Sequence, residues 1–161
     1  MSKICFTDFD GVLNNYSWFT PRNSTKKWHL DEDLIQNLNK ITTATDSKIV
    51  LSTSWRTMYP FHDIVQALED HGCLADVIGK TPDLSGTNAN GPFWAPRGNE
   101  IALWLKDHSE VTNMVILDDE MDMEPLMDYH VHTSFNDGLT LAKVEEAIKM
   151  LAKPLILHSA L

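Results

Sequence analysis

Short apolar runs alternate along the chain with stretches in which apolar residues recur at helical spacing. The runs are continuous, which is typical of strands buried on both faces of a parallel sheet. They predict strands over residues 3–7, 49–51, 76–79, 114–117 and 130–133. The helical spacing predicts helices over residues 30–41, 61–68, 97–105 and 141–151. Because strands and amphipathic helices alternate, the pattern indicates an α/β fold, a three-layer Rossmann-like parallel sheet of about five strands with helices on both faces.

The length of 161 residues leaves room for one hydrophobic core of ordinary size. We therefore expect a single domain over residues 1–161. Hydrophobic residues make up 43% of the chain, but no segment approaches the roughly 20 consecutive apolar residues of a membrane span. The first residues also lack the apolar stretch of a secretory signal. These features predict a cytoplasmic protein without a membrane partner.

The charge of the chain is uneven. With 23 acidic and 13 basic residues the net charge is −10, which argues against a protein that coats DNA or RNA in general. Residues 14–30, however, contain no acidic residue, and they hold Arg22, Lys26 and Lys27 together with aromatic residues such as Trp18. This segment is either a solvated loop or a flap that contacts substrate. We call it the flap segment.

Polar residues follow the predicted strands at their carboxyl ends. Asp8 and Asp10 come after the first strand, residues 52–54 after the second, and Asp118 and Asp119 after the fourth. These ends meet at one edge of a parallel sheet, where ligands bind. Four carboxylates gathered there would repel one another and raise each other's pKa unless a cation lay between them. A hard divalent cation, Mg²⁺ above all, is the simplest partner for such a group.

The order of these residues resembles the motifs of the haloacid dehalogenase (HAD) superfamily of phosphatases. The first motif reads Asp8-Phe9-Asp10-Gly11-Val12, and the fourth is the acidic pair Asp118-Asp119. Between them lie a hydroxyl residue at the end of the second strand and a cation ahead of the fourth. A finer resemblance is to the small, capless HAD domains of RNA-repair proteins and of polynucleotide kinase-phosphatases. It is carried by Thr53-Ser54-Trp55-Arg56, Arg97-Gly98-Asn99-Glu100-Ile101 and Gly138-Leu139-Thr140.

The resemblance implies a phosphatase that works through an aspartyl-phosphate. Asp8 would be the nucleophile, while Asp10 would protonate the leaving oxygen and then activate water. Mg²⁺ would be held by the Asp8 carboxylate, the Asp10 backbone carbonyl and one or both of Asp118 and Asp119. The order of motifs differs from that of receiver domains, which carry the phosphate-accepting aspartate after the third strand.

The phosphate-binding residues implied by the resemblance are Thr53, Ser54 and Arg97. For the second motif the alignment favours Thr53, with Ser52 and Ser54 one residue away on either side. For the third motif Arg97 is preferred to Lys80, because the family places its cation near the start of that helix and arginine grips phosphate with two bonds.

The inserts after the first motif and over residues 81–96 are too short for the folded cap domain of many relatives. An open site of this kind would admit a nucleotide or a nucleic-acid end, with the aromatic residues of the flap segment stacking on a base. The alternatives are a small-metabolite or protein phosphatase of the same fold, or a non-catalytic phosphate-binding module.

Overall fold

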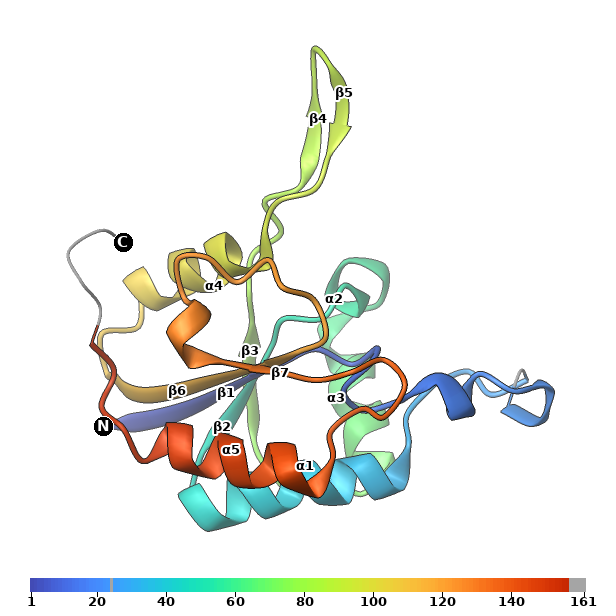
Figure 1. Ribbon diagram of the computed structural model, residues 1–161. Coiled ribbons are helices and arrows are strands. Elements are labelled where there is room, and N and C mark those ends of the chain that lie inside the picture. The colour runs from blue at the N-terminus through green and yellow to red at the C-terminus, as the bar shows by residue number, and fades with distance from the viewer. Residues whose placement is uncertain (24, 157–161) are drawn as a thin grey trace.

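The computed structural model describes residues 1–23 and 25–156, apart from the side chain of Arg22. Its main sheet has five parallel strands in the order β3-β2-β1-β6-β7, which confirms the predicted α/β architecture (Figure 1). The strands are β1 (Ser2–Thr7), β2 (Lys48–Leu51), β3 (Val77–Lys80), β6 (Val111–Asp118) and β7 (His130–His132). After β1 the chain builds outward to β3 and then returns to β6 on the other side of β1. The sheet therefore has its topological switch point between β1 and β6, where ligands bind in folds of this type.

Helices cover both faces of the sheet. They are α1 (Glu32–Thr45), α2 (Trp55–Met58), α3 (Phe61–Asp70), α4 (Arg97–Lys106) and α5 (Leu141–Leu151), and short 3₁₀ turns lie at Tyr16–Trp18, Pro21–Asn23 and Met127–Tyr129. Asp31 caps α1 by accepting the Asp33 N–H at 2.9 Å, and Thr140 caps α5. Among the described residues, no helix is long and apolar enough to cross a membrane.

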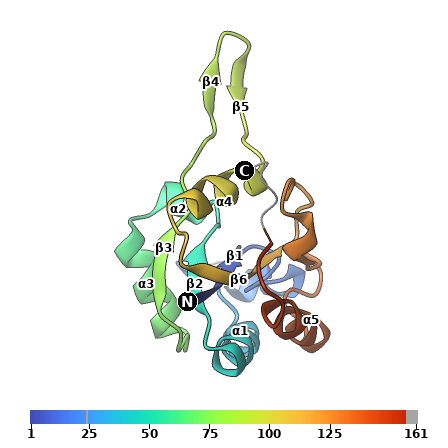
Figure 2. The same cartoon turned by 90° about the vertical axis from the view of Figure 1, so that its left-hand side faces the viewer.

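Strand residues alternate between two hydrophobic cores. Cys5 packs with side chains of α1, α3 and α5 on one face, whereas its neighbours Ile4 and Phe6 pack with side chains of α4 on the other. Figure 2 shows α4 on the side of the sheet opposite α1 and α5. Burial on both faces explains why the strands are continuous apolar runs in the sequence.

A two-stranded hairpin stands away from the main sheet. It consists of β4 (Gly86–Asn88) and β5 (Gly91–Phe93), which pair antiparallel, and it projects beyond α4 (Figures 1 and 2). The apolar pattern of the sequence did not predict this hairpin. The hairpin is the structure adopted by the short insert ahead of Arg97, and no large cap domain is present among the described residues.

Candidate active site

Three carboxylates meet at the carboxyl end of β1 and β6. These strands are neighbours in register, with Thr7 beside Leu117, and the N–H of Asp8 donates to the Leu117 carbonyl at 3.0 Å. Asp8 and Asp118 are thereby placed side by side. One oxygen each of Asp8, Asp118 and Asp119 lies within 4.8 Å of the others. We call these three residues the carboxylate cluster.

The turn after β1 is folded tightly against the cluster. Gly11 has a φ of +76°, and a Cβ at this position would overlap the Asp119 carboxylate. Its N–H donates to the Asn14 side-chain oxygen at 2.9 Å, and its carbonyl accepts the Thr133 hydroxyl at 2.7 Å. Only glycine fits this position, because it combines a left-handed conformation with close contact to Asp119.

Asp10 is held by residues outside its own motif. The Asn14 amide donates to one of its carboxylate oxygens at 2.9 Å, and the Trp55 indole N–H donates to the other at 3.2 Å. The same Asn14 amide also donates to the His29 carbonyl at 2.8 Å. No motif in the sequence predicted these roles for Asn14 or Trp55. Together the two donors fix the orientation of the Asp10 carboxylate.

Two histidines hold the backbone of the acidic pair. Since a carbonyl can only accept, His130 Nε2 donates to the Asp118 carbonyl at 3.0 Å and His132 Nε2 donates to the Asp119 carbonyl at 2.9 Å. The Asp118 side chain accepts the Glu120 N–H at 2.9 Å through one oxygen. Its second oxygen is buried and has no hydrogen-bond partner among the described residues.

Burial raises the pKa values of the three carboxyl groups in the cluster, because it disfavours their charged form. Burial raises the pKa of Asp8 to about 7, although the nearby Arg97 charge lowers it again in part. Burial and then the Asp8 charge raise the pKa of Asp118 to about 8. The pKa of Asp119 is also raised, again mainly by burial. The residues therefore fit a hard cation, which takes oxygen ligands and would partner the orphaned Asp118 oxygen.

Arg97 is the first residue of α4, and its charge acts on both Asp8 and Asp118. Its backbone N–H donates to the Asp122 carboxylate at 3.0 Å, while one guanidinium nitrogen, Nη1, is buried without a hydrogen-bond partner among the described residues. The alternative cation, Lys80, ends β3 and is exposed. An unpaired guanidinium N–H beside a carboxylate cluster is available for an anion such as a phosphoryl group.

The three hydroxyl residues after β2 differ in their contacts. Thr53 is fully buried, and its oxygen accepts the Trp55 N–H at 3.3 Å, which leaves the hydroxyl proton free to donate. The Ser52 oxygen is also buried and has no partner among the described residues, whereas Ser54 is exposed. The contacts thus leave a hydroxyl proton available on each candidate for the second motif.

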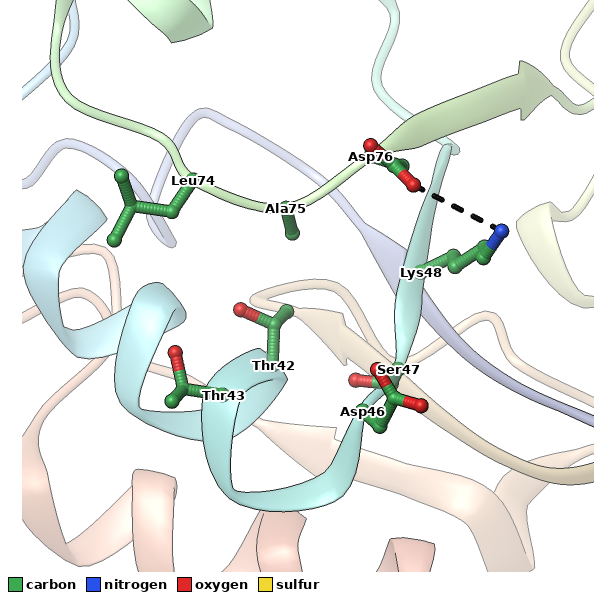
Figure 3. Close-up of a pocket in the computed structure, with 8 residues that line it drawn as sticks. All are labelled: Thr42, Thr43, Asp46, Ser47, Lys48, Leu74, Ala75 and Asp76. Carbon is green, nitrogen blue, oxygen red and sulfur yellow. Dashed lines mark ion pairs between the residues drawn. The ribbon is translucent and has the colours of Figure 1, made fainter.

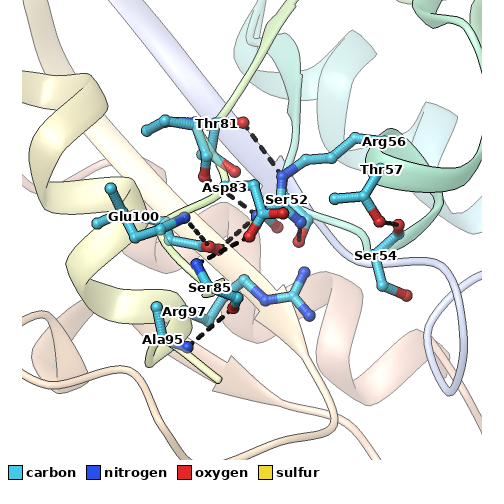
Figure 4. Close-up of polar contacts among 12 residues, drawn as sticks. Ser52, Ser54, Arg56, Thr57, Thr81, Asp83, Ser85, Ala95, Arg97 and Glu100 are labelled. Atoms are coloured by element: carbon cyan, nitrogen blue, oxygen red, sulfur yellow. Dashed lines mark hydrogen bonds and ion pairs between the residues drawn. The ribbon is translucent and has the colours of Figure 1, made fainter. Parts of the chain in front are cut away.

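A buried ion pair joins the elements that carry these residues. Arg56 of α2 and Glu100 of α4 lie 2.5 Å apart, and both side chains are almost completely buried. Arg56 also donates to the Thr53 carbonyl at 2.8 Å. It donates to the Thr81 carbonyl at 3.1 Å as well (Figure 4). Figure 4 also draws the Arg97 side chain, to which no dashed line runs from Arg56 or Glu100. The ion pair fixes the end of β2, the start of α4 and the chain leading into the hairpin relative to one another.

The flap segment is anchored at both ends beside Asp10, through Asn14 and the His29 carbonyl. Lys26 Nζ lies over the Trp18 ring at 4.5 Å, and Lys27 Nζ lies over the Trp28 ring at 5.0 Å. The side chain of Arg22 lies outside the described part of the chain. A cavity of about 530 Å³ is lined by Trp18, Phe19, Thr20, Pro21, Asn23 and His29.

A smaller cavity, of about 230 Å³, lies at the opposite end of the sheet between the end of α1 and the starts of β2 and β3 (Figure 3). Its charged residues include Lys48 and Asp76, which are exposed and 3.8 Å apart. It is separate from the carboxylate cluster, because it borders the amino ends of the strands.

Comparison with protein-family models matched residues 4–144 to the family described as the HAD domain in Swiss Army Knife RNA repair proteins. Comparisons with curated proteins and with solved structures gave no significant match. The matched region runs from β1 into α5 and includes the carboxylate cluster, Asp10 and Arg97. It confirms the resemblance carried by the four motifs. The chain belongs to the family of HAD domains found in Swiss Army Knife RNA repair proteins.

Proposed function

We propose that this protein is a magnesium-dependent phosphomonoesterase that acts on a nucleotide or a nucleic-acid end. Family membership indicates a phosphatase-type function, and the family description concerns RNA repair. The observation that carries the proposal is the carboxylate cluster, whose oxygens lie within 4.8 Å of one another, together with the unpaired guanidinium nitrogen of Arg97. Such a site combines a nucleophile, a place for a cation and a phosphate ligand.

Asp8, Asp118 and Asp119 would hold Mg²⁺, together with the Asp10 backbone carbonyl that the family resemblance implies. When bound, the ion supplies positive charge that offsets the repulsion between the Asp8 carboxylate and the phosphoryl oxygens. The orphaned oxygen of Asp118 supports this assignment, because a buried carboxylate oxygen without a partner is costly.

In the first step an oxygen of Asp8 attacks phosphorus, and the bond between phosphorus and the ester oxygen breaks. Asp10 gives its proton to that leaving oxygen, so that an alcohol departs and an aspartyl-phosphate remains on Asp8. The hydrogen bonds from Asn14 and Trp55 support this role, since they hold the Asp10 carboxylate in one orientation.

In the second step the ionised Asp10 takes a proton from water, and the water oxygen attacks phosphorus. The bond between phosphorus and Asp8 breaks, which releases inorganic phosphate and restores both carboxyl groups to their starting states. Arg97 and the Thr53 hydroxyl would bind the phosphoryl oxygens and stabilise the charge that develops on them, with Ser54 and Ser52 as the neighbouring donors.

The substrate would approach beside the flap segment. This segment carries Lys26 and Lys27 on aromatic rings, and its cavity of about 530 Å³ is lined mainly by aromatic and other apolar surface. Aromatic rings favour a base over a sugar, because every base offers a flat face for stacking. These features support a nucleotide or nucleic-acid end rather than a sugar phosphate.

The test is phosphate release from a panel of substrates, with Mg²⁺ and with EDTA. The panel holds an aryl phosphate, nucleoside monophosphates, oligonucleotides phosphorylated at the 3′ or the 5′ end, sugar phosphates and a phosphopeptide. We expect multiple turnovers that require Mg²⁺, with the highest kcat/KM on a nucleotide or oligonucleotide. Full activity in EDTA would contradict the metal assignment, and a preference for sugar phosphates or the phosphopeptide would contradict the substrate class.

A further inference from the structure

The hairpin ahead of Arg97 exposes apolar side chains that a folded protein normally buries. Trp94 is 89% exposed, and Phe93 and Leu84 are 41% and 38% exposed. Leu84 and Trp94 flank the two hairpin strands, and a tryptophan left in water forgoes a large favourable burial. Within residues 1–23 and 25–156, no side chain covers Trp94, which makes its indole available to a binding partner.

The base of the hairpin is fixed to the site. The Leu84 N–H donates to Glu100 at 3.0 Å, and the Ala95 N–H donates to the Ser85 hydroxyl at 2.9 Å, which closes the two strands at their base. Arg56, a member of the same buried ion pair, donates to the Pro82 carbonyl at 3.1 Å. Trp94 thus projects from a base whose position relative to α4 is set by buried polar contacts.

The exposed indole lies close to the proposed phosphate site along the chain. Trp94 precedes Arg97 by three residues, so their Cα atoms are separated by at most roughly 11 Å, three times the spacing of consecutive residues. The charge of Arg97 acts on Asp8 and Asp118. A nucleic-acid strand whose terminal phosphate contacts Arg97 is therefore long enough to pass Trp94 as well.

The hairpin itself carries no negative charge that would repel an anionic polymer. The chain carries −10 overall, yet residues 84–99 contain no acidic residue, just as the flap segment contains none. The polar side chains of the hairpin, Thr87, Asn88 and Asn90, are neutral donors and acceptors. A nucleic-acid strand is thus not repelled here, and its bases can stack on an indole without regard to sequence.

We propose that the β4–β5 hairpin is a binding arm for single-stranded nucleic acid, on which a base close to the phosphorylated end stacks against Trp94. The inference rests on the proposed phosphatase function and extends it to the substrate. The flap segment and the hairpin would then both offer aromatic side chains to the bound strand.

The test compares kcat/KM for a phosphorylated oligonucleotide with kcat/KM for an aryl phosphate in the full chain. We expect the ratio of the two to fall about tenfold or more in Trp94→Ala, because stacking on one aromatic side chain contributes strongly to single-strand binding. Trp94→Phe keeps an aromatic face and should recover most of the ratio. The control is Leu74→Ala, which removes a side chain that is 77% exposed at the opposite end of the sheet and should leave the ratio unchanged.

An unchanged ratio in Trp94→Ala, with both substrates still hydrolysed, would overturn the binding arm and leave the phosphatase proposal intact. An equal loss on a phosphopeptide would also overturn it, since the hairpin would then serve any large substrate. So would a change from dimer to monomer in light scattering, which would show that Trp94 binds a second copy of the chain. Failure of the wild type to hydrolyse the aryl phosphate would instead contradict the proposed function itself.

Discussion

At the scale of single residues, the orientation of Asp10 depends on two N–H donors that its motif does not contain. Trp55→Phe removes the indole donor and keeps an aromatic ring in the core. We expect kcat to fall about tenfold on an alkyl phosphate and less on an aryl phosphate, because only a poor leaving group needs full protonation by Asp10. Steady-state rates on both substrates measure the difference.

The matched control is Trp104→Phe, since Trp104 is buried to a similar extent but packs in the other core. It should affect both substrates alike. Equal losses on the two substrates in Trp55→Phe would speak against an orienting role for the indole.

Some side-chain positions in the site could be predicted from the sequence, and others could not. Asp8 and Asp118 directly follow apolar runs, so their placement at one sheet edge was readable from local pattern. The contact between Trp55 and Asp10 spans 45 positions and depends on how α2 packs. Trp55 is buried, but its hydrogen bond to Asp10 was not foreseen. No local signal in the sequence pairs these two residues.

At the scale of elements, the position of Arg97 depends on how closely α4 approaches the loop after β6. A Cβ on Gly98 would overlap the backbone of Met123 and Glu124, and the Gly98 N–H donates to the Asp122 carbonyl at 3.0 Å. We expect Gly98→Ala to raise KM for an aryl phosphate by about tenfold and to lower Tm. The overlap with fixed backbone outweighs the roughly 1 kcal/mol by which alanine favours a helix.

Gly79→Ala serves as the control, because a Cβ there would meet only the Trp104 indole nitrogen at 3.7 Å, an ordinary contact. It should leave KM close to that of the wild type. A Gly98→Ala protein with normal KM and Tm would show that α4 is free to shift without cost.

The main sheet and the longer helices that cover it were predictable, whereas the hairpin and α2 were not. The strands of the main sheet and the helices α1, α3, α4 and α5 carry apolar periodicity, so their existence could be read from the sequence. The hairpin strands have three residues each and no buried face, and α2 has four residues. The hairpin is held instead by contacts of its base with Arg56 and Glu100, which are remote in sequence.

For the molecule as a whole, we expect the carboxylate cluster to link stability to pH and to metal. Burial raises the pKa of Asp8 to about 7 and of Asp118 to about 8, above their values near 4 in an unfolded chain. The folded, metal-free protein thus binds protons more tightly than the unfolded chain. The contribution of Asp8 and Asp118 to the free energy of unfolding is therefore fully present below about pH 4, and it is lost as the pH rises towards 8.

We expect the free energy of unfolding in EDTA to fall by a few kcal/mol between pH 5.5 and 8, since each pKa unit corresponds to about 1.4 kcal/mol. Mg²⁺ should restore most of this loss, and the gain should be largest at pH 8. Urea denaturation measures both effects. Asp118→Asn should flatten the pH dependence and weaken the response to Mg²⁺. If the free energy of unfolding changed with pH equally in the variant and in the wild type, the pH dependence could not come from Asp118.

The central claim is that Asp8 is the nucleophile, and the most direct test is phosphate release from an aryl phosphate by Asp8→Asn. An amide cannot form the aspartyl-phosphate, so we predict no turnover above background at any Mg²⁺ concentration, in a protein that stays folded because a buried charge has been removed. Asp119→Asn, by contrast, should regain activity as Mg²⁺ is raised. Phosphate release near the wild-type rate by folded Asp8→Asn would contradict the account.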